Sequence, residues 1–117
     1  KIDVVGSCGH GTGVFWFEAP AWKKHVIDAD LASPHALALG DFDGDGDPDA
    51  AVASFTALVV CWYENDGKGS FTRHDIDATN KQQAYDLKTA DIDADAKLDL
   101  ILAGRESRNV VWYRNGR

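Results

Sequence analysis

The chain has 117 residues, which suits one compact domain and is short for two. It carries 19 acidic and 12 basic residues, a formal net charge of −7, which argues against nucleic acid or an anionic membrane surface as a partner. No run approaches the roughly 18 apolar residues that a membrane-spanning helix needs, so we expect no membrane insertion.

The first 30 residues contain three short runs that predict β-strands. Lys1–Val5 and Val14–Glu18 are rich in β-branched and aromatic residues, and a third such run follows them. The segment before the third run, Ala19–Lys24, holds Trp22, which has no counterpart elsewhere in the chain. These runs predict a partial structural unit over residues 1–30.

A complete unit of four strands is predicted over residues 35–77. The expected strands are Ala36–Gly40, Ala50–Ala53, Val59–Tyr63 and Phe71–Ile76. An aspartate-rich segment separates the first two, and the turn residues Asn65–Gly69 predict a hairpin between the last two. Four antiparallel strands in roughly 40 to 50 residues are typical of one β-propeller blade.

Residues 85–117 repeat the first three of these strands and end with the aromatic run Asn109–Asn115. In all three units an aspartate precedes a tryptophan by 13 positions, in the pairs Asp3 and Trp16, Asp49 and Trp62, and Asp99 and Trp112. The repeat period, from Asp41 to Asp91, is 50 residues. The chain is therefore predicted to be all-β, a single propeller-repeat domain over residues 1–117 with about two and a half blades.

This number of blades is too small for a closed propeller. Propellers close with roughly four to eight blades, and isolated repeats cannot bury both of their faces. We therefore expect either self-association into a homo-oligomer or a longer parent chain, and the sequence leaves both open.

The aspartate-rich segment of the complete unit has the spacing of a cation-binding loop. Carboxylates stand at alternate positions: Asp41, Asp43, Asp45, Asp47 and Asp49. Ca²⁺ takes about six to eight oxygen ligands from a tightly curved backbone, and Gly44 and Gly46 permit that curvature. The predicted ligands are the side chains of Asp41, Asp43, Asp45 and Asp49 and the main-chain carbonyl of Asp47.

Two other structures could place aspartates at this spacing. An EF-hand requires a glutamate at loop position 12 and helices on both sides, but Val52 and Leu102 occupy that position and strands flank the loops. A turn of solvated aspartates that cap main-chain amides is the second alternative. It leaves the repulsion among the carboxylates without an offset, so we favour Ca²⁺.

The second unit of this kind predicts a weaker calcium site. Its expected ligands are Asp91, Asp93, Asp95, Asp99 and the carbonyl of Lys97. Alanines replace both glycines, at Ala94 and Ala96, and an alanine with positive φ costs about 1 kcal/mol. Lys97 also adds a positive charge.

These motifs resemble the FG-GAP/VCBS-type repeats that form the blades of integrin-α-like propellers. The matching segments are residues 40–49, 90–99 and 62–71, and the resemblance covers nearly the whole chain. It implies a secreted, extracellular propeller in which a calcium ion stabilises the loop between the first two strands of a blade. Family members serve as adhesion modules, lectins and accessory domains, so the fold does not identify the ligand.

Three further residues are candidate ligand contacts. Trp22 offers a stacking surface for a sugar ring, with burial against another chain as an equal alternative. His35 and Tyr85 occupy corresponding places in strands that line the central channel of a propeller, although a structural role is the better explanation for both. No nucleophile, phosphate loop, zinc motif or separate acid–base pair is evident, so we expect no enzyme.

The sequence supports two functional hypotheses. The first is a non-catalytic, calcium-binding module that recognises a glycan or a protein. The second is a structural unit whose incomplete blades associate into rings or fibres, with Ca²⁺ as the stabiliser.

Overall fold

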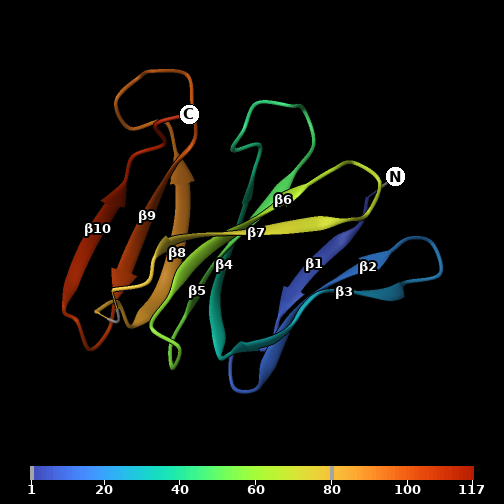
Figure 1. Ribbon diagram of the computed structural model, residues 1–117, viewed down its shortest axis with the longest axis horizontal. Helices are drawn as coiled ribbons and strands as arrows, with labels where there is room; N and C mark the ends of the chain where they lie inside the picture. The colour runs from blue at the N-terminus through green and yellow to red at the C-terminus, as the bar shows by residue number, and fades with distance from the viewer. Residues whose placement is uncertain (1, 80) are drawn as a thin grey trace.

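The computed structural model describes residues 2–79 and 81–117 (Figure 1). This part of the chain contains strands and no helix. The strands are β1 (Val4–Ser7), β2 (Thr12–Glu18), β3 (Lys23–Ala32), β4 (Pro34–Gly40), β5 (Asp49–Ser54), β6 (Val60–Asn65), β7 (Phe71–Asp77), β8 (Ala84–Ala90), β9 (Asp99–Gly104) and β10 (Asn109–Tyr113). Consequently, no helix in the described residues is long and apolar enough to cross a membrane.

The strands form three antiparallel sheets, each from consecutive strands. Their orders are β1-β2-β3, β4-β5-β6-β7 and β10-β9-β8. The all-β prediction is confirmed, and sheets of three and four antiparallel strands are consistent with one complete and two partial propeller blades. Residue 1, from which the first partial blade is predicted to extend, lies outside the described residues.

The predicted strand Lys1–Val5 differs from the structure. β1 begins at Val4, where the ladder with β2 opens with the pair Val4–Phe17. Before this pair, the Asp3 carboxylate accepts a hydrogen bond from Ala19 N at 2.8 Å. The Asp3 side chain therefore makes the hydrogen bond at this end of the sheet, where the sequence predicts main-chain hydrogen bonds between the strands.

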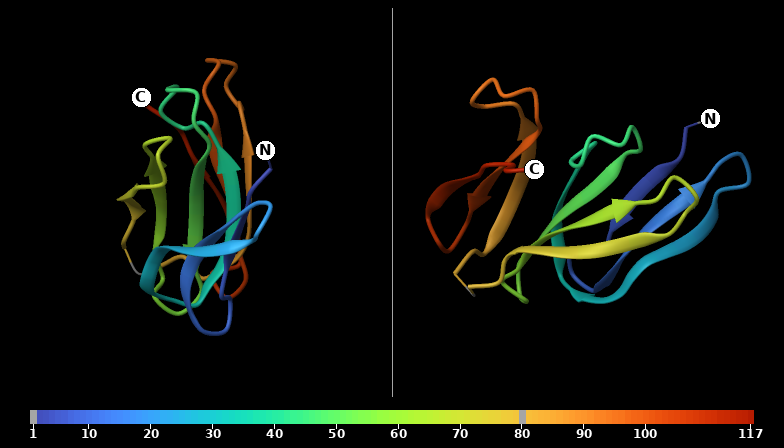
Figure 2. Two further views of the ribbon diagram at one scale, coloured as in Figure 1. Left: turned by 90° about the vertical axis from the view of Figure 1, so that its right-hand side faces the viewer. Right: turned by 45° about the horizontal axis from the view of Figure 1, so that its top comes forward.

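The three sheets follow one another in space in chain order, with β1–β3 in blue at one side and β8–β10 in orange and red at the other (Figures 1 and 2). β4 lies beside β8, so the first strands of the two later blades come together, and β4 also contacts β1. The loops between the first and second strands of the two later sheets, residues 41–48 and 91–98, occupy corresponding positions.

Two apolar layers hold the sheets together, and β5 contributes to both. Because side chains alternate across a strand, Ala51 and Ala53 pack towards β8 and β9, while Val52 packs towards the first sheet. All six residues of β5 are buried, as the central element of a layered structure should be. The middle sheet is therefore the structural centre of the described chain.

The repeated tryptophans show which sheet faces are covered. Trp62 is 7% exposed and lies in the layer between the second and third sheets. Trp112, its counterpart on β10, is 47% exposed, and nearby Val110 is 73% exposed. No further sheet covers that face among the described residues.

Candidate metal centre

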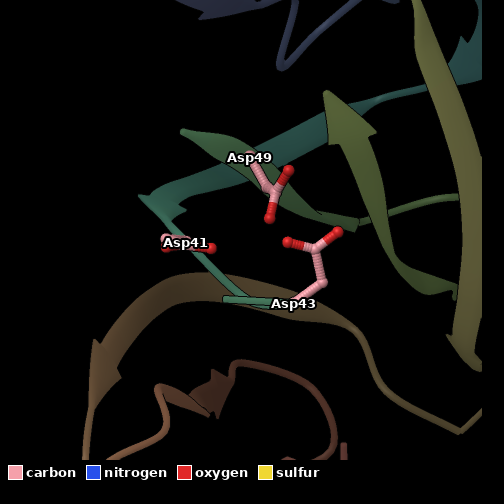
Figure 3. A group of neighbouring side chains, drawn as sticks. All are labelled: Asp41, Asp43 and Asp49. Atoms are coloured by element: carbon pink, nitrogen blue, oxygen red, sulfur yellow. The ribbon is translucent and has the colours of Figure 1, made fainter. Parts of the chain in front are cut away.

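The loop between β4 and β5 brings three of the predicted calcium ligands together. Carboxylate oxygens of Asp41, Asp43 and Asp49 all lie within 4.8 Å of one another. Figure 3 shows the side chains of Asp43 and Asp49 pointing towards each other across the loop. Asp49 is fully buried, whereas the other two are partly accessible.

The backbone of this loop curls around the Asp41 carboxylate. Its two oxygens accept hydrogen bonds from Gly44 N at 2.7 Å and from Gly46 N at 3.1 Å. Gly44 and Gly46 have φ angles of +83° and +95°, in the region that glycine enters without steric cost. The curvature that the two glycines predict is therefore present.

Asp49 anchors the loop to the rest of its sheet. One of its oxygens accepts a hydrogen bond from Phe42 N at 2.9 Å, and the other accepts one from Asn65 N at 2.9 Å. Burial raises the pKa of the Asp49 carboxyl, and the nearby negative charges of Asp43 and Asp45 raise it further. A divalent cation at this point would offset that repulsion, so the donor set fits Ca²⁺.

The remaining two predicted ligands of the first loop lie outside this group of three carboxylates. Asp45 is exposed, and its carboxylate accepts a hydrogen bond from Asp47 N at 2.8 Å. The Asp47 side chain lies against Gly67 in the β6–β7 turn, so close that an added Cβ there would meet Asp47 Oδ2 at 2.2 Å. Coordination by Asp45 and by the Asp47 carbonyl remains a prediction.

The loop between β8 and β9 repeats the geometry of the first. Carboxylate oxygens of Asp91, Asp93 and Asp99 lie within 4.8 Å of one another. Ala94 and Ala96 have φ angles of +61° and +67°, which are the strained values expected where alanine replaces glycine. The second loop therefore adopts the same curl at a conformational cost that the first avoids.

Positive side chains surround the second loop. Arg114 pairs with Asp93, and its second amino nitrogen lies 3.6 Å from the Asp95 carboxylate. Lys97 Nζ is 3.9 Å from the same Asp95 group. The pKa of Asp99 is lowered, chiefly by the hydrogen bond from Asn115 N and also by the charge of Arg114, in contrast to Asp49.

The aspartate that stands 13 positions before each repeated tryptophan has the same structural role in all three units. Asp3, Asp49 and Asp99 each accept a hydrogen bond through Oδ1 from the main chain three residues after the repeated tryptophan. The donors are Ala19, Asn65 and Asn115, at 2.8, 2.9 and 2.8 Å respectively. The spacing of 13 residues thus reflects a recurring bond that fixes the start of the second strand.

A repeated contact between sheets was not predicted from the sequence. Tyr63 on β6 donates a hydrogen bond to Asp28 of the first sheet at 2.7 Å, and Tyr113 on β10 donates one to Asp77 of the second at 2.7 Å. Both tyrosines directly follow a repeated tryptophan. The tyrosine after the tryptophan is therefore the sequence feature that could have indicated this contact. The first unit lacks it, because Phe17 follows Trp16 there.

The structure brings together two of the three candidate ligand contacts. The rings of His35 and Tyr85 stack with centroids 5.7 Å apart, and His10 meets His35 edge-on at 5.6 Å. Trp22 is 54% exposed in the β2–β3 turn. The strand β3 leads from this turn towards β4, so Trp22 and His35 lie beyond opposite ends of β3.

A groove lies between the first and second sheets, beside the aspartate loop that joins β4 and β5. Its volume is about 310 Å³, and its lining includes Trp16, Asp47 and Asn65. The indole nitrogen of Trp16 is buried and has no hydrogen-bond partner among the described residues. The groove thus combines an aromatic side chain with polar groups.

Comparison with known proteins agrees with these features. The sequence model of the FG-GAP-like repeat matches residues 41–102, which includes both aspartate loops and the strands between them. No curated protein and no solved structure matches the chain.

Proposed function

The chain belongs to the FG-GAP-like repeat family, and we propose that it is a non-catalytic, calcium-binding module of an extracellular β-propeller that recognises a glycan or a protein. FG-GAP repeat families are generally non-enzymatic, which supports the non-catalytic part of the proposal. In this role the ion stabilises the blade, and the surfaces between blades carry the ligand.

The convergence of Asp41, Asp43 and Asp49 carries the proposal. Three carboxylate oxygens within 4.8 Å provide a dense negative site on a curled backbone. Hard oxygen donors of this type suit Ca²⁺, which tolerates irregular coordination better than Mg²⁺. The ion would join the end of β4 to the start of β5, because Asp41 and Asp49 lie at those two positions.

Calcium titration calorimetry tests this proposal. We expect the unmodified chain to bind Ca²⁺ in the first loop and Asp43→Asn to lose that binding, because Asp43 supplies a charged oxygen of the group. Asp30→Asn is the matched control, since Asp30 is exposed on β3 and away from both loops. The proposal fails if the unmodified chain takes up no Ca²⁺, or if Asp43→Asn binds it unchanged.

Recognition of a ligand is supported by exposed aromatic side chains and by the groove between the first two sheets. Trp16 presents a partly buried ring there, and Trp22 presents an exposed one in the turn between β2 and β3. Aromatic rings stack on sugar faces, and they are also enriched at protein interfaces. Binding on a glycan array that disappears with Trp22→Ala would support a glycan ligand, whereas retained binding would exclude Trp22 as a contact.

Self-assembly is a second candidate function, favoured by the two three-stranded sheets. The exposed apolar side chains of Val110 and Trp112 lie on the outer face of the last sheet, where a complete propeller would continue. A second copy would cover this face. Light scattering with Ca²⁺ and with EDTA tests the idea, and a monomer under both conditions would contradict it.

A further inference from the structure

The residue two positions after each repeated tryptophan distinguishes the three units. In the first two units it is Glu18 or Glu64, and each glutamate pairs with a histidine on the next strand of its own sheet. These pairs are Glu18 with His25 at 3.0 Å and Glu64 with His74 at 2.7 Å. In the third unit the residue is Arg114, which turns instead towards the second aspartate loop.

Arg114 contacts the oxygens that a metal ion would use. Its Nε donates to Asp93 Oδ2, and Asp93 belongs to the group of three converging carboxylates in that loop. Its Nη2 reaches Asp95 at 3.6 Å. Arginine presents several N–H donors in a planar fork that matches carboxylate oxygens, so one side chain can bridge both aspartates.

The charge around the two loops differs accordingly. The first loop, with Glu64, has six acidic residues and no basic one, whereas the second loop, with Arg114, has four acidic and two basic residues. The two alanines do not by themselves account for a difference in metal binding. Ala94 and Ala96 already adopt positive φ, and the carboxylates of both loops converge to the same 4.8 Å limit.

We propose that Arg114 is a tethered counter-ion that sets the calcium affinity of the second loop, so that the first loop is the principal calcium site of the chain. The proposal rests on the proposed function, because it takes Ca²⁺ as the ion of the first loop. Calcium entering the second loop must displace the guanidinium from Asp93 or bind beside it. At roughly 6 Å from a divalent ion, a single positive charge lowers affinity about tenfold even in water.

Calcium titration of the second loop alone tests this assignment. Asp43→Asn disables the first loop, so any remaining uptake of Ca²⁺ in that background reports the second. Adding Arg114→Gln removes the positive charge and should tighten binding about tenfold, and adding Arg114→Glu, which reproduces Glu64, should tighten it about a hundredfold. The matched control adds Arg105→Glu, because Arg105 follows β9 at the opposite end of the sheet and has the same change of charge.

The outcome is decided by comparing the Kd values of these variants, with circular dichroism confirming the β-sheet content of each. A graded tightening at Arg114 with no change at Arg105 supports the tethered counter-ion. Equal Kd values, or no second-loop binding in any variant, overturn it. Failure of the unmodified first loop to bind Ca²⁺ would refute the proposed function separately, because the Asp43→Asn series does not use that loop.

Discussion

At the scale of single residues, the contacts between sheets include hydrogen bonds to two aspartates in addition to the apolar layers. Asp28 accepts from the Tyr63 hydroxyl and from the backbone of Asp30 and Leu31, and Arg73 lies 3.3 Å from it. Asp77 accepts from Tyr113 in the same geometry. Each bond joins the last strand of one sheet to the third strand of the next, so it links neighbouring blades directly.

Removing one of these hydroxyls should weaken the contact between sheets. Tyr63→Phe deletes the donor to Asp28 and leaves the buried ring in place, since Tyr63 is 1% exposed. We expect a loss of about 1.5 kcal/mol in the free energy of unfolding, which is typical for a hydrogen bond to a charged group. Urea denaturation measures it, with Tyr85→Phe as a control on an exposed tyrosine. An unchanged midpoint for Tyr63→Phe would contradict the role of this bond.

The same aspartates predict a loss of stability in acid. Burial opposes the charge of Asp28, but the Tyr63 hydroxyl and two backbone amides leave its pKa lowered overall. The pKa of Asp77 is lowered mainly by the Thr79 hydroxyl. Because the folded-state values are depressed, this stabilisation is complete above the ordinary aspartate pKa of about 3.9 and disappears as pH falls through the lower folded values. The urea concentration at the midpoint of unfolding should therefore fall as the pH is lowered from 5 to 2. The fall should be smaller for Tyr63→Phe, which lacks the hydroxyl that lowers the pKa of Asp28.

At the scale of the element, the two aspartate loops share one conformation but differ in strain. Gly46 and Ala96 are equivalent and have φ angles of +95° and +67°. An added Cβ at Gly46 would meet nothing within 4 Å beyond its own chain neighbours, so the cost of alanine there comes from the local backbone conformation and not from contact with other parts of the structure. The sequence predicts both the curl and its cost.

Exchanging these residues should shift stability in opposite directions. We expect Gly46→Ala to cost about 1 kcal/mol, because L-residues are disfavoured at positive φ. Ala96→Gly should gain about 0.5 kcal/mol, since relief of strain exceeds the added entropy of the unfolded chain. Thermal unfolding in EDTA measures both without a contribution from metal. Ala78→Gly is the control at a residue without positive φ, and a loss of stability in Ala96→Gly would contradict the strain argument.

The elements themselves could largely be predicted from the sequence, whereas several contacts could not. Alternating apolar residues and the 13-residue spacing located the strands, because side-chain periodicity and turn residues are local properties. The pairing of Arg114 with Asp93 and of Tyr63 with Asp28 joins residues that are 21 and 35 positions apart. The first contact depends on how a loop folds over its own sheet and the second on how two sheets are placed against each other, and a single sequence specifies neither. The start of β1 at Val4 depends on the hydrogen bond from Ala19 to Asp3, which local strand propensity does not predict either.

At the scale of the whole molecule, the two faces of the third sheet differ. The second sheet covers one face, and no further sheet among the described residues covers the other. Trp62 lies in the layer between the second and third sheets, and Trp112 lies on the outer face of the third. The same residue type therefore contributes to folding in one blade and is available for association in the next.

Alanine substitutions at these two tryptophans should separate folding from assembly. Trp62→Ala should cost about 3 to 5 kcal/mol, as expected for a large buried aromatic side chain. Trp112→Ala should cost much less in the monomer, because the ring is 47% exposed, but it should lower the molar mass if copies associate through this face. Denaturation and light scattering give the two quantities. Equal destabilisation by both changes would contradict the difference in burial.

The central claim is that a calcium ion completes the loop between β4 and β5 and thereby stabilises the molecule. Its most direct test is the melting temperature in excess Ca²⁺ and in EDTA, for the unmodified chain and for Asp43→Asn. Because a ligand that binds only the folded state raises stability, we predict a higher melting temperature with Ca²⁺ and little or no shift in Asp43→Asn. The same melting temperature in Ca²⁺ and in EDTA for the unmodified chain would contradict the claim.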